Sequence, residues 1–590
     1  MKELEYPFDS SYIIKNKVRL KKYLLKDKVS RIPVRIAVLG GSTTHDICNF
    51  LQLFLLHLGI TPTFYESEYN KYWEDAMFPN SKLKKFQPDL IYIHTTVRNI
   101  SIKIKSTDTT EEIDKKLEWQ YGHFEEMWER LRQEYHCPII QNNFERPLIR
   151  LYGNKDISDA HGFSNFISRL NQRFYEYAKG ISWLHIHDVD YIASTYGLDR
   201  WHDLTAWYMY KYAMAVNAMP EYCYNLSNII KSLYGKNKKV LVVDLDNTLW
   251  GGVIGEDGLN GLELGEESAT GEMYREIQEY IKAQKETGII LAVNSKNDMS
   301  NVELAFSHPD MQLKLEDFSA IDANWNQKGE NILDIADKLK LGLDSTVFID
   351  DNPVERANVK EQLPMVTVPE LSEPEQYIKI LNRAGYFEVT HLSDEDRKRS
   401  EMYQAIEKCN LEKEKYVDYS EFLKHLKMEG IIRNIDEDTV QRVAQLTNKS
   451  NQFNLTTKRC TEGDIRKYMA DESYICLYGR LKDKFCDNGI VSILMARKDK
   501  NLAHIELFLM SCRVLKRGME DAMMDELFRI LDSTECEKVM GYYYQTKKNG
   551  MVEDLYMDMG FALKENFVDG KSFVIDKKDY KKRNKYIRMV

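Results

Sequence analysis

The chain has 590 residues, too many for a single hydrophobic core, because domains cluster at about 100–200 residues. Its composition, 43% hydrophobic and 29% charged with 29 Gly and 13 Pro, is that of a folded globular protein and excludes collagen or a largely disordered chain. The formal net charge of -10 argues against a dedicated nucleic-acid binder. An anionic ligand must therefore meet a local group of basic residues.

The cysteines and the amino terminus indicate the compartment. The nine cysteines are scattered without a Cys-x-x-Cys pair, which indicates neither a zinc site nor a disulfide framework. The amino terminus carries acidic residues where a signal peptide needs basic ones, and the longest apolar run, around Phe50–Ile60, is too short to span a bilayer. We therefore expect a cytoplasmic protein with no membrane span.

Strand-like apolar runs that alternate with helical stretches divide the chain into regions. The first set of runs lies at Val34–Leu39, Leu90–Ile93, Pro138–Ile140 and Trp183–Ile186, and the second at Val240–Val243, Ile289–Val293, Val347–Ile349 and Met365–Val368. Alternation of this kind is typical of α/β domains. It predicts one such domain over residues 1–225 and another over residues 236–385.

The remaining residues, 390–590, are expected to form a third domain of the α+β class. Ser393–Asp396 has the pattern of a helix capping box, and strand-like runs at 473–477, 489–496 and 503–510 mix with helical stretches. The final segment, Asp576–Val590, holds seven Lys or Arg and is expected to be a solvated tail, with a docking patch for a partner as the alternative.

Two carboxylates, Asp244 and Asp246, follow the buried run Val240–Val243 directly. The carboxyl ends of strands are where open α/β sheets bind ligands. A carboxylate there can attack phosphorus and form an acyl phosphate, while a neighbour two residues on protonates the leaving group. We therefore predict Asp244 as the nucleophile and Asp246 as the general acid and base of phosphoryl transfer.

This chemistry requires cations, because bare aspartates repel a phosphate. Asp350 and Asp351 end the run Val347–Ile349. With Asp244 and the backbone carbonyl of Asp246, they could complete an all-oxygen Mg²⁺ site.

Two further residues complete the pattern. Lys328 opens a predicted helix and can neutralise the transferring group, and Ser295 ends a run and can donate a hydrogen bond to a phosphoryl oxygen. The ordered set Asp-x-Asp-x-Thr, Ser, Lys and acidic pair resembles the haloacid dehalogenase (HAD) superfamily of phosphatases, which implies a Rossmann-like α/β fold. Thr248 and Asn294, within these motifs, are expected to contact the phosphate. Only 46 residues separate Thr248 from Ser295, so any cap over the site is minimal.

The segment Glu506–Glu520 has the pattern of an apolar strand, a basic glycine-containing turn and a helix amino terminus, whose backbone N–H groups can bind phosphate. Together with the Tyr-x-x-x-Gly-Phe motif at Tyr556–Phe561, it resembles the GNAT acyltransferase fold. Glu520 stands where that family has a small residue, which argues against ordinary acetyl-coenzyme A use. The resemblance implies phosphate or carrier-arm contacts from Arg513, Lys516, Arg517, Gly518 and Tyr556.

Four segments together resemble the FkbH-like family over residues 236–570: Asp246–Val253, Asn451–Thr457, Asp487–Gly489 and Ser511–Leu515. The resemblance implies a HAD domain joined to a GNAT-like domain. It further implies that one phosphate is removed from 1,3-bisphosphoglycerate and that glycerate is loaded onto the phosphopantetheine arm of an acyl carrier protein.

Cys512 is the cysteine that this chemistry singles out. Arg513, Lys516 and Arg517 follow it near a predicted helix amino terminus, which favours the thiolate. We hypothesise that Cys512 holds the acyl group before a carrier thiol takes it; the alternative is a buried cysteine that acts as a small hydrophobe. Three polar residues either contact the acyl group or carrier arm or form a polar turn: Asn451, Gln452 and Asn454.

Ser42 follows the first run in a Gly-Gly-Ser sequence, where SGNH hydrolases keep their serine, and Asp199-x-x-His202 fits that family's late motif. The resemblance implies a flavodoxin-like three-layer α/β fold and a triad of Ser42, His202 and Asp199, with Asn99 or Asn142 as the oxyanion donor. The alternative is a degenerate α/β domain used for docking or oligomerisation.

The leading interpretation is a cytoplasmic, Mg²⁺-dependent enzyme that dephosphorylates a small phosphorylated acid and transfers its acyl group to an acyl carrier protein. One alternative is a HAD phosphatase acting on a sugar phosphate or phosphoprotein in surface-polysaccharide synthesis, with the third domain only binding. The other is a non-enzymatic assembly scaffold, which the four intact motif elements argue against.

Overall fold

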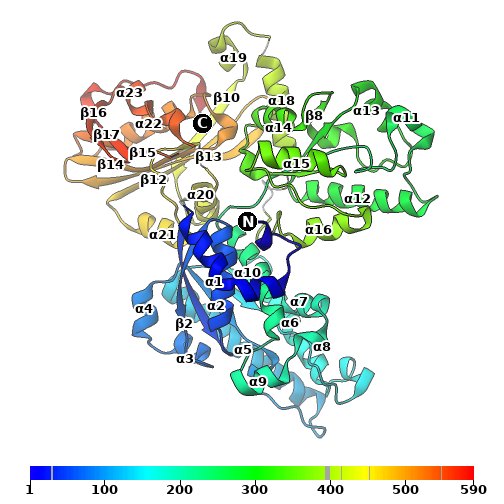
Figure 1. The fold of residues 1–590 in the computed structure, drawn as a ribbon. Coiled ribbons are helices and arrows are strands. Elements are labelled where there is room, and N and C mark those ends of the chain that lie inside the picture. The colour runs from blue at the N-terminus through cyan, green and yellow to red at the C-terminus, as the bar shows by residue number, and fades with distance from the viewer. Residues whose placement is uncertain are drawn as a thin grey trace. The chain divides into compact units, whose positions relative to one another are not determined.

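The computed structural model describes residues 1–27, 29, 31–392, 397, 399–413, 415–450, 452–546 and 548–590 (Figure 1). The chain forms two compact units: unit 1 is Met1–Leu233 with Glu388–His391, and unit 2 is Tyr234–Phe387 with Leu392–Val590. The predicted capping box at Ser393–Asp396 and the predicted contact residue Asn451 lie outside the described residues. Each of the three predicted domain ranges holds one sheet, but their boundaries stay a prediction.

Unit 1 is built on a five-stranded parallel sheet in the order β2-β1-β3-β4-β5. Its strands are β1 (Ile32–Gly40), β2 (Ile60–Glu66), β3 (Leu90–His94), β4 (Ile139–Asn142) and β5 (Leu184–His187). Four of them coincide with predicted runs, whereas β2 escapes prediction because Pro62 and polar residues interrupt its apolar pattern. Proline is tolerated there because β2 is an edge strand.

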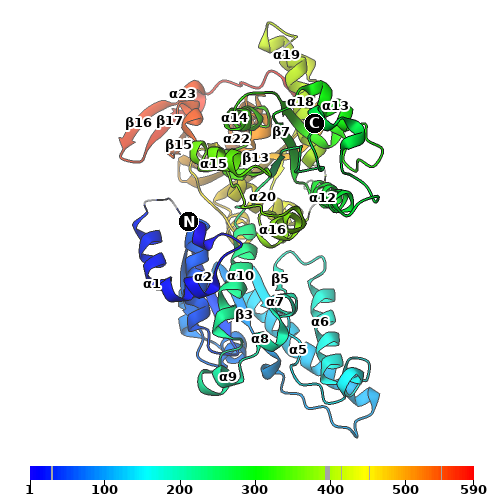
Figure 2. The ribbon, with the colours of Figure 1, turned by 45° about the vertical axis from the view of Figure 1, so that its right-hand side comes forward.

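Helices cover both faces of this sheet, which makes unit 1 a three-layer α/β fold (Figures 1 and 2). On one face α5 (Thr110–Tyr135) and α6 (Phe163–Ala178) bury an apolar core that includes Leu39, Ile91 and Trp128. On the other face lie α2 (His45–His57) and α10 (Met219–Leu233). The central strand β3 is buried at every position, which explains its apolar run Leu90–Ile93.

Unit 2 begins with a four-stranded parallel sheet in the order β8-β7-β6-β9. Its strands are β6 (Val240–Val243), β7 (Ile290–Ser295), β8 (Phe318–Ala323) and β9 (Thr346–Ile349). The prediction of a sheet strand at Met365–Val368 was wrong: Val366 and Val368 pack in the core, but Thr367 forms only an isolated bridge with Val347. The edge strand β8 was missed.

The rest of unit 2 contains a nine-stranded mixed sheet, in the order β16-β17-β15-β14-β13-β12-β10-β18 with β11 paired to β14. The strands are β10 (Met428–Asn434), β11 (Phe453–Asn454), β12 (Tyr474–Lys482), β13 (Asp487–Asp499), β14 (Leu502–Met510), β15 (Lys538–Tyr544), β16 (Ala562–Phe567), β17 (Gly570–Asp576) and β18 (Ile587–Met589). The helix α22 (Met519–Leu531) follows β14 and packs against this sheet.

The basic carboxyl-terminal segment is folded, so the prediction of a solvated tail was wrong. Its residues 587–589 form β18 beside β10. Tyr580 stacks on Phe528 of α22 at a ring-centre distance of 3.8 Å, and Arg583 pairs with Asp521. Apolar contacts and ion pairs thus hold a segment whose composition is mostly charged. Separately, every helix in the described ranges is too short or too polar to cross a bilayer.

Candidate active site

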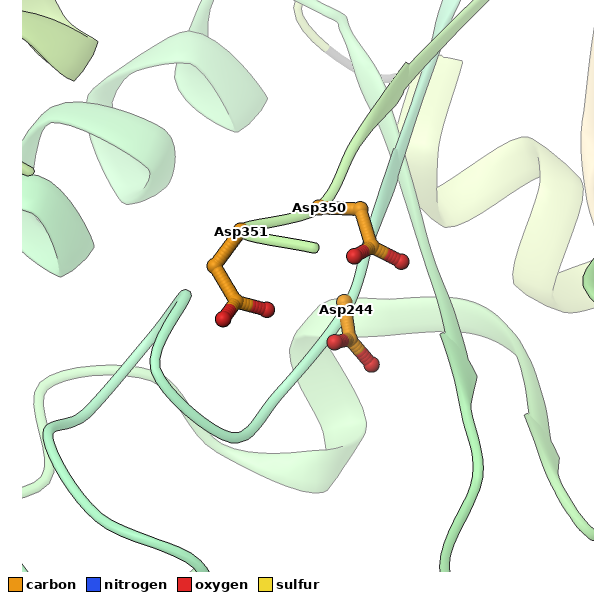
Figure 3. A group of neighbouring side chains, drawn as sticks. All are labelled: Asp244, Asp350 and Asp351. Carbon is orange, nitrogen blue, oxygen red and sulfur yellow. The ribbon is translucent and has the colours of Figure 1, made fainter. Parts of the chain in front are cut away.

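Three carboxylates meet at the carboxyl edge of the four-stranded sheet. Strands β6 and β9 are parallel neighbours, with Val243 opposite Ile349, so the residues that follow them lie side by side. One carboxylate oxygen from each of Asp244, Asp350 and Asp351 lies within 4.8 Å of the other two (Figure 3). The structure therefore brings together the three acidic side chains that the motif pattern singled out.

Lys328 lies among these carboxylates. It is the first residue of α14 (Lys328–Lys338), and its Nζ lies 2.9 Å from Asp244 Oδ1 and also contacts Asp350 Oδ2. Burial alone would lower the pKa of Lys328, but the charges of Asp244 and Asp350 outweigh burial and raise it above the usual value. Lys328 is thus held as a cation where the predicted phosphoryl group would arrive.

The donor set fits a hard divalent cation. When all groups are ionised, the three carboxylates and the one ammonium group carry a net charge of two negative units. Two of these carboxylates, Asp244 and Asp350, are buried. Burial raises the pKa of Asp244 to about 6, with Asp350 adding to the shift and Lys328 opposing it. Buried charges need compensation, and carboxylate oxygens are the ligands Mg²⁺ prefers.

Asp246 is oriented by three hydrogen bonds of its own. Its Oδ1 accepts from Trp250 Nε1 at 2.9 Å and from the backbone N–H of Ile254 at 3.1 Å, while its Oδ2 accepts from Asn297 Nδ2 at 2.7 Å. Its side chain is outside the three-carboxylate cluster, so the backbone carbonyl remains its predicted contribution to a metal site. Sequence reasoning missed both Trp250 and Asn297, because neither residue type signals a role by itself.

Three further predicted residues line the same edge. Thr248 Oγ1 accepts a hydrogen bond from the backbone N–H of Asp351 at 3.1 Å, and Asn294 Nδ2 donates to the carbonyl of Lys328 at 2.9 Å. Ser295, the last residue of β7, is buried beside them. Thr248 and Asn294 therefore position the backbone of the acidic pair and of Lys328.

Arg356 is a site residue that the sequence did not reveal. It lies on α15 (Pro353–Gln362), and its Nη1 donates to the carbonyls of Asp350 at 2.7 Å and Asp351 at 2.6 Å, while Nη2 donates to the carbonyl of Leu371 at 2.9 Å. Asn352 directly follows the acidic pair and is the N-cap of α15, so the helix begins within two residues of Asp351. Arg356 is thus a positioning residue for two predicted metal ligands.

Arg356→Gln is expected to weaken Mg²⁺ binding and phosphate release by about 10- to 100-fold, the usual effect of removing a group that orients metal ligands. Titration calorimetry with Mg²⁺ measures the affinity, and Arg356→Lys should restore part of it. Lys360→Gln, one turn further along the same helix and ion-paired with Glu370, is the matched control and should bind Mg²⁺ normally. Equal Mg²⁺ affinity in Arg356→Gln and the wild type would contradict this role.

The predicted thiol, Cys512, begins a short 3-10 turn after β14 and is half-buried. Of the basic residues that follow it, Arg517 forms a buried ion pair with Asp483, so it is not open to a phosphate, contrary to prediction. Lys516 is exposed, and Gly518 adopts the left-handed conformation that begins α22. Arg513 remains close to Cys512, in the wall of the same cavity.

Other predicted contacts of this region are structural. Tyr556 is completely buried in the core, where its ring lies so close to Gly541 that a Cβ there would be 2.5 Å from it. Its predicted contact with a carrier arm is therefore wrong. Asn454 forms a polar turn, since its Oδ1 accepts from the backbone of Thr457 at 2.9 Å, whereas Gln452 lines the cavity beside Cys512.

In unit 1 the structure pairs Ser42 with a different histidine from the predicted one. Ser42 Oγ lies 2.9 Å from His94 Nε2, because β1 and β3 are neighbours and both residues lie at the carboxyl edge of the sheet. His202 Nε2 instead lies 3.2 Å from the carbonyl of Arg146, and Asp199 is exposed. The predicted triad of Ser42, His202 and Asp199 is thus not assembled.

The predicted oxyanion donors are also engaged. Asn142 is bonded through both side-chain atoms to the backbone of Thr95, at 2.8 and 2.7 Å. Asn99 Nδ2 donates to the carbonyl of Gly41 at 2.9 Å. These bonds brace the loops after β1, β3 and β4, which favours the interpretation of unit 1 as an α/β domain without the predicted hydrolytic site.

Unit 1 is expected to lose stability in acid. Burial lowers the pKa of His94 and of His187 to about 3 and that of His185 to about 4. Their unfolded pKa is about 6.5, so below that pH the unfolded chain binds protons that the folded unit does not. Stability should therefore fall as pH drops from about 6.5 toward 4, by up to about 1.4 kcal/mol per pH unit and histidine.

Hydrogen exchange of strands β3 and β5, corrected for intrinsic rates, measures this at pH 7.5 and pH 5. His187→Asn should flatten the pH dependence, whereas His45→Asn, at an exposed histidine, should leave it unchanged. Equal protection of the wild type at both pH values would refute the expectation.

A parallel sheet that brings Asp244, Asp350 and Asp351 around a buried lysine defines an enzyme of the HAD phosphatase class. The family model of the FkbH N-terminal domain matches residues 35–231. The chain is also similar to the crystal structure of the N-terminal part of BF1531 from Bacteroides fragilis, described as containing a phosphatase domain complexed with Mg. That match has 30% identity and a TM-score of 0.59, and covers 64% of this chain and 99% of that one. The chain belongs to the FkbH-like family.

Two further solved structures match a smaller part of the chain, and the first is described as an acetyltransferase of the GNAT family. An acetyltransferase from Streptococcus pneumoniae is 15% identical, with a TM-score of 0.21, and the match covers 25% of this chain and 99% of that one. Ard1 from Thermoplasma volcanium is 17% identical, with a TM-score of 0.21, and the match covers 25% and 97%. A search of curated proteins found no match.

Proposed function

We propose that the chain is a Mg²⁺-dependent phosphatase and acyltransferase. It removes a phosphate from a small phosphorylated acid and transfers the acyl group to the phosphopantetheine thiol of an acyl carrier protein in the cytoplasm. The proposed substrate is 1,3-bisphosphoglycerate. The observation that carries the proposal is the cluster at one sheet edge of the buried residues Asp244, Lys328 and Asp350 with the half-buried Asp351. The half-buried thiol of Cys512 belongs to the same compact unit.

In the phosphatase step, Asp244 attacks phosphorus through a carboxylate oxygen. The P–O bond to the acid breaks, and the leaving oxygen takes a proton from Asp246. Asp246 then accepts a proton from water, whose oxygen attacks the aspartyl phosphate and releases inorganic phosphate. Lys328 and Ser295 donate hydrogen bonds to phosphoryl oxygens throughout. A Mg²⁺ held by Asp244, Asp350, Asp351 and the carbonyl of Asp246 would neutralise phosphoryl charge.

In the acyl-transfer step, the thiolate of Cys512 attacks the carbonyl carbon of the acyl phosphate. A C–S bond forms, the C–O bond to phosphate breaks, and phosphate leaves as the anion. The carrier thiolate then attacks the thioester, which regenerates the Cys512 thiolate and leaves the acyl group on the carrier.

One observation favours the second candidate, a phosphatase whose third domain only binds. Arg517 is locked by Asp483 and Tyr556 is buried in the core, so two predicted contacts of the third domain with a phosphate or carrier arm are lost. In this case the substrate would be a sugar phosphate or phosphoprotein.

Phosphate release from different substrates distinguishes the proposed function from the second candidate. Purified enzyme is incubated with 1,3-bisphosphoglycerate, with a sugar phosphate and with a phosphopeptide, each with Mg²⁺ or after chelation. We expect release from the small acid, lost on chelation and restored by Mg²⁺. Release from the sugar phosphate or phosphopeptide alone would support the second candidate instead.

A further inference from the structure

A cavity of about 400 Å³ lies inside unit 2, within the range of small-molecule sites. Its wall combines residues that precede strands of the four-stranded sheet, Lys239 and Ser345, with residues that follow β14, Ser511 to Arg513. Cys512 is one of the residues of this wall. The cavity is therefore formed jointly by the phosphatase-like part and the nine-stranded part of the unit.

The wall is strongly basic although the chain carries a net charge of -10. Asp344 is the one acidic residue among the described residues of the wall, and it pairs with Lys548 at 2.6 Å. Among the other basic residues of the wall, Lys340 pairs at 2.8 Å with Asp337, which lies outside the wall. The six basic wall residues are Lys239, Lys340, Arg399, Arg442, Arg513 and Lys548.

Lys239 and Arg513 are the cations best placed to meet a ligand. The backbone of Lys239 is fixed, because its N–H donates to the carbonyl of Ser345 at 2.7 Å, while its Nζ has no hydrogen bond or ion pair with another described residue. Arg513 donates only to weak or neutral acceptors, Ser511 Oγ at 3.2 Å and Met402 Sδ at 2.8 Å, within the described ranges. Burial lowers the pKa of Lys239; Cys512 and Asp344 oppose this shift, while Arg399 and Arg513 add to it. A bound anion would relieve the cost of burying the charge.

This cavity is separate from the Asp244 centre. Lys239 precedes β6 and Asp244 follows it, so the two sites lie at opposite edges of the same sheet. Five residues of extended chain separate their backbones by about 16 Å. A three-carbon acid phosphorylated at both ends spans about 8 Å between its phosphorus atoms, since three successive bonds span 3.8 Å in a peptide chain. One substrate molecule cannot occupy both sites at once.

We propose that this cavity is a second site that binds the phosphoryl group of a small organic phosphate beside Cys512. The identity of the acid rests on the proposed function, but the binding itself does not require turnover. The two ends of a doubly phosphorylated acid are then processed in two separate binding events, one at Asp244 and one at Cys512.

Alkylation of Cys512 by iodoacetamide, followed by peptide mass spectrometry on the full chain, tests the proposal. Inorganic phosphate and 3-phosphoglycerate are compared with chloride at equal ionic strength. At ten times Kd, either phosphate should slow alkylation of Cys512 about tenfold. Cys486 is the internal control, because it is also half-buried but does not line the cavity, and its rate should not change.

Variants locate the binding site. Lys239→Gln and Arg513→Gln should each raise the phosphate concentration needed for protection about tenfold or more, as expected for the loss of one charged hydrogen bond. Having both variants keeps the test valid if one fails to fold. Lys360 pairs with Glu370 outside the cavity, so in the Lys360→Gln variant phosphate should protect Cys512 as well as it does in the wild type.

Three results would overturn the proposal. The first is that neither phosphate slows alkylation of Cys512, and the second is that both cavity variants are protected as well as the wild type. The third is that 4′-phosphopantetheine protects Cys512 but 3-phosphoglycerate does not. The last result would assign the cavity to a carrier arm. Phosphate release is measured on the same preparations. If phosphate protects Cys512 but the enzyme releases no phosphate, the cavity site is supported and the proposed phosphatase function fails. If the enzyme releases phosphate but Cys512 is not protected, the phosphatase function is supported and the cavity site fails.

Discussion

Asp244→Asn is expected to reduce phosphate release by more than about 10³-fold, because the substitution removes the attacking oxygen of the proposed covalent step. The variant should still fold, since Lys328 keeps its contact with Asp350. Initial rates of phosphate release from 1,3-bisphosphoglycerate at saturating Mg²⁺ measure the effect, and the loss should appear in kcat.

Asp317→Asn is the matched control for this substitution. Asp317 is also buried, and it forms an ion pair with Lys285 at 2.7 Å. It precedes β8, however, so it lies at the amino ends of the strands, whereas Asp244 lies at their carboxyl ends. Its loss should leave kcat unchanged. An Asp244→Asn enzyme with wild-type kcat would rule out the phosphoaspartyl mechanism.

Cys512→Ser is expected to abolish loading of the carrier protein while phosphate release at Asp244 continues. A serine hydroxyl is a far weaker nucleophile than a thiolate at neutral pH, so loading should fall by at least about 10²-fold. The two activities separate because Asp244 follows β6, whereas Cys512 lines the cavity beside Lys239, which precedes β6. Intact mass of the enzyme after incubation with substrate detects the acyl group on the wild type and its absence in the variant.

The control for Cys512→Ser is Cys486→Ser, at the other half-buried cysteine among the described residues. This variant should carry the acyl group and load the carrier normally. If Cys512→Ser loaded the carrier at the wild-type rate, the acyl group would have to pass directly to the carrier thiol, and the covalent role of Cys512 would be excluded.

The strand ends of the phosphatase-like sheet could be predicted because one physical pattern marks them. A short run of apolar residues followed at once by acidic residues identified Asp244, Asp350 and Asp351, and parallel pairing of β6 with β9 brought them together. The residues that orient them could not be predicted in this way. Arg356 acts through backbone carbonyls and Asn297 through a loop contact 51 residues from Asp246 in sequence, and neither contact leaves a pattern in the sequence.

The other regions show where local sequence is insufficient. Ser42 was expected to use His202 because Asp199-x-x-His202 resembles the late motif of SGNH hydrolases, but the order of strands gives it His94. Arg517 was assigned to a phosphate from its place in a basic turn, whereas Asp483, a distant residue in sequence, neutralises it. The basic cavity around Cys512 combines residues from both parts of unit 2, so no single segment could reveal it.

The central claim is that phosphate removal and acyl transfer to a carrier occur in this one chain. Intact mass spectrometry of acyl carrier proteins, after incubation with the enzyme, Mg²⁺ and 1,3-bisphosphoglycerate, tests it most directly. We expect a carrier that gains a glyceryl group without phosphate, and no gain with Cys512→Ser. Phosphate release with an unchanged carrier mass, across carriers bearing the phosphopantetheine arm, would contradict it.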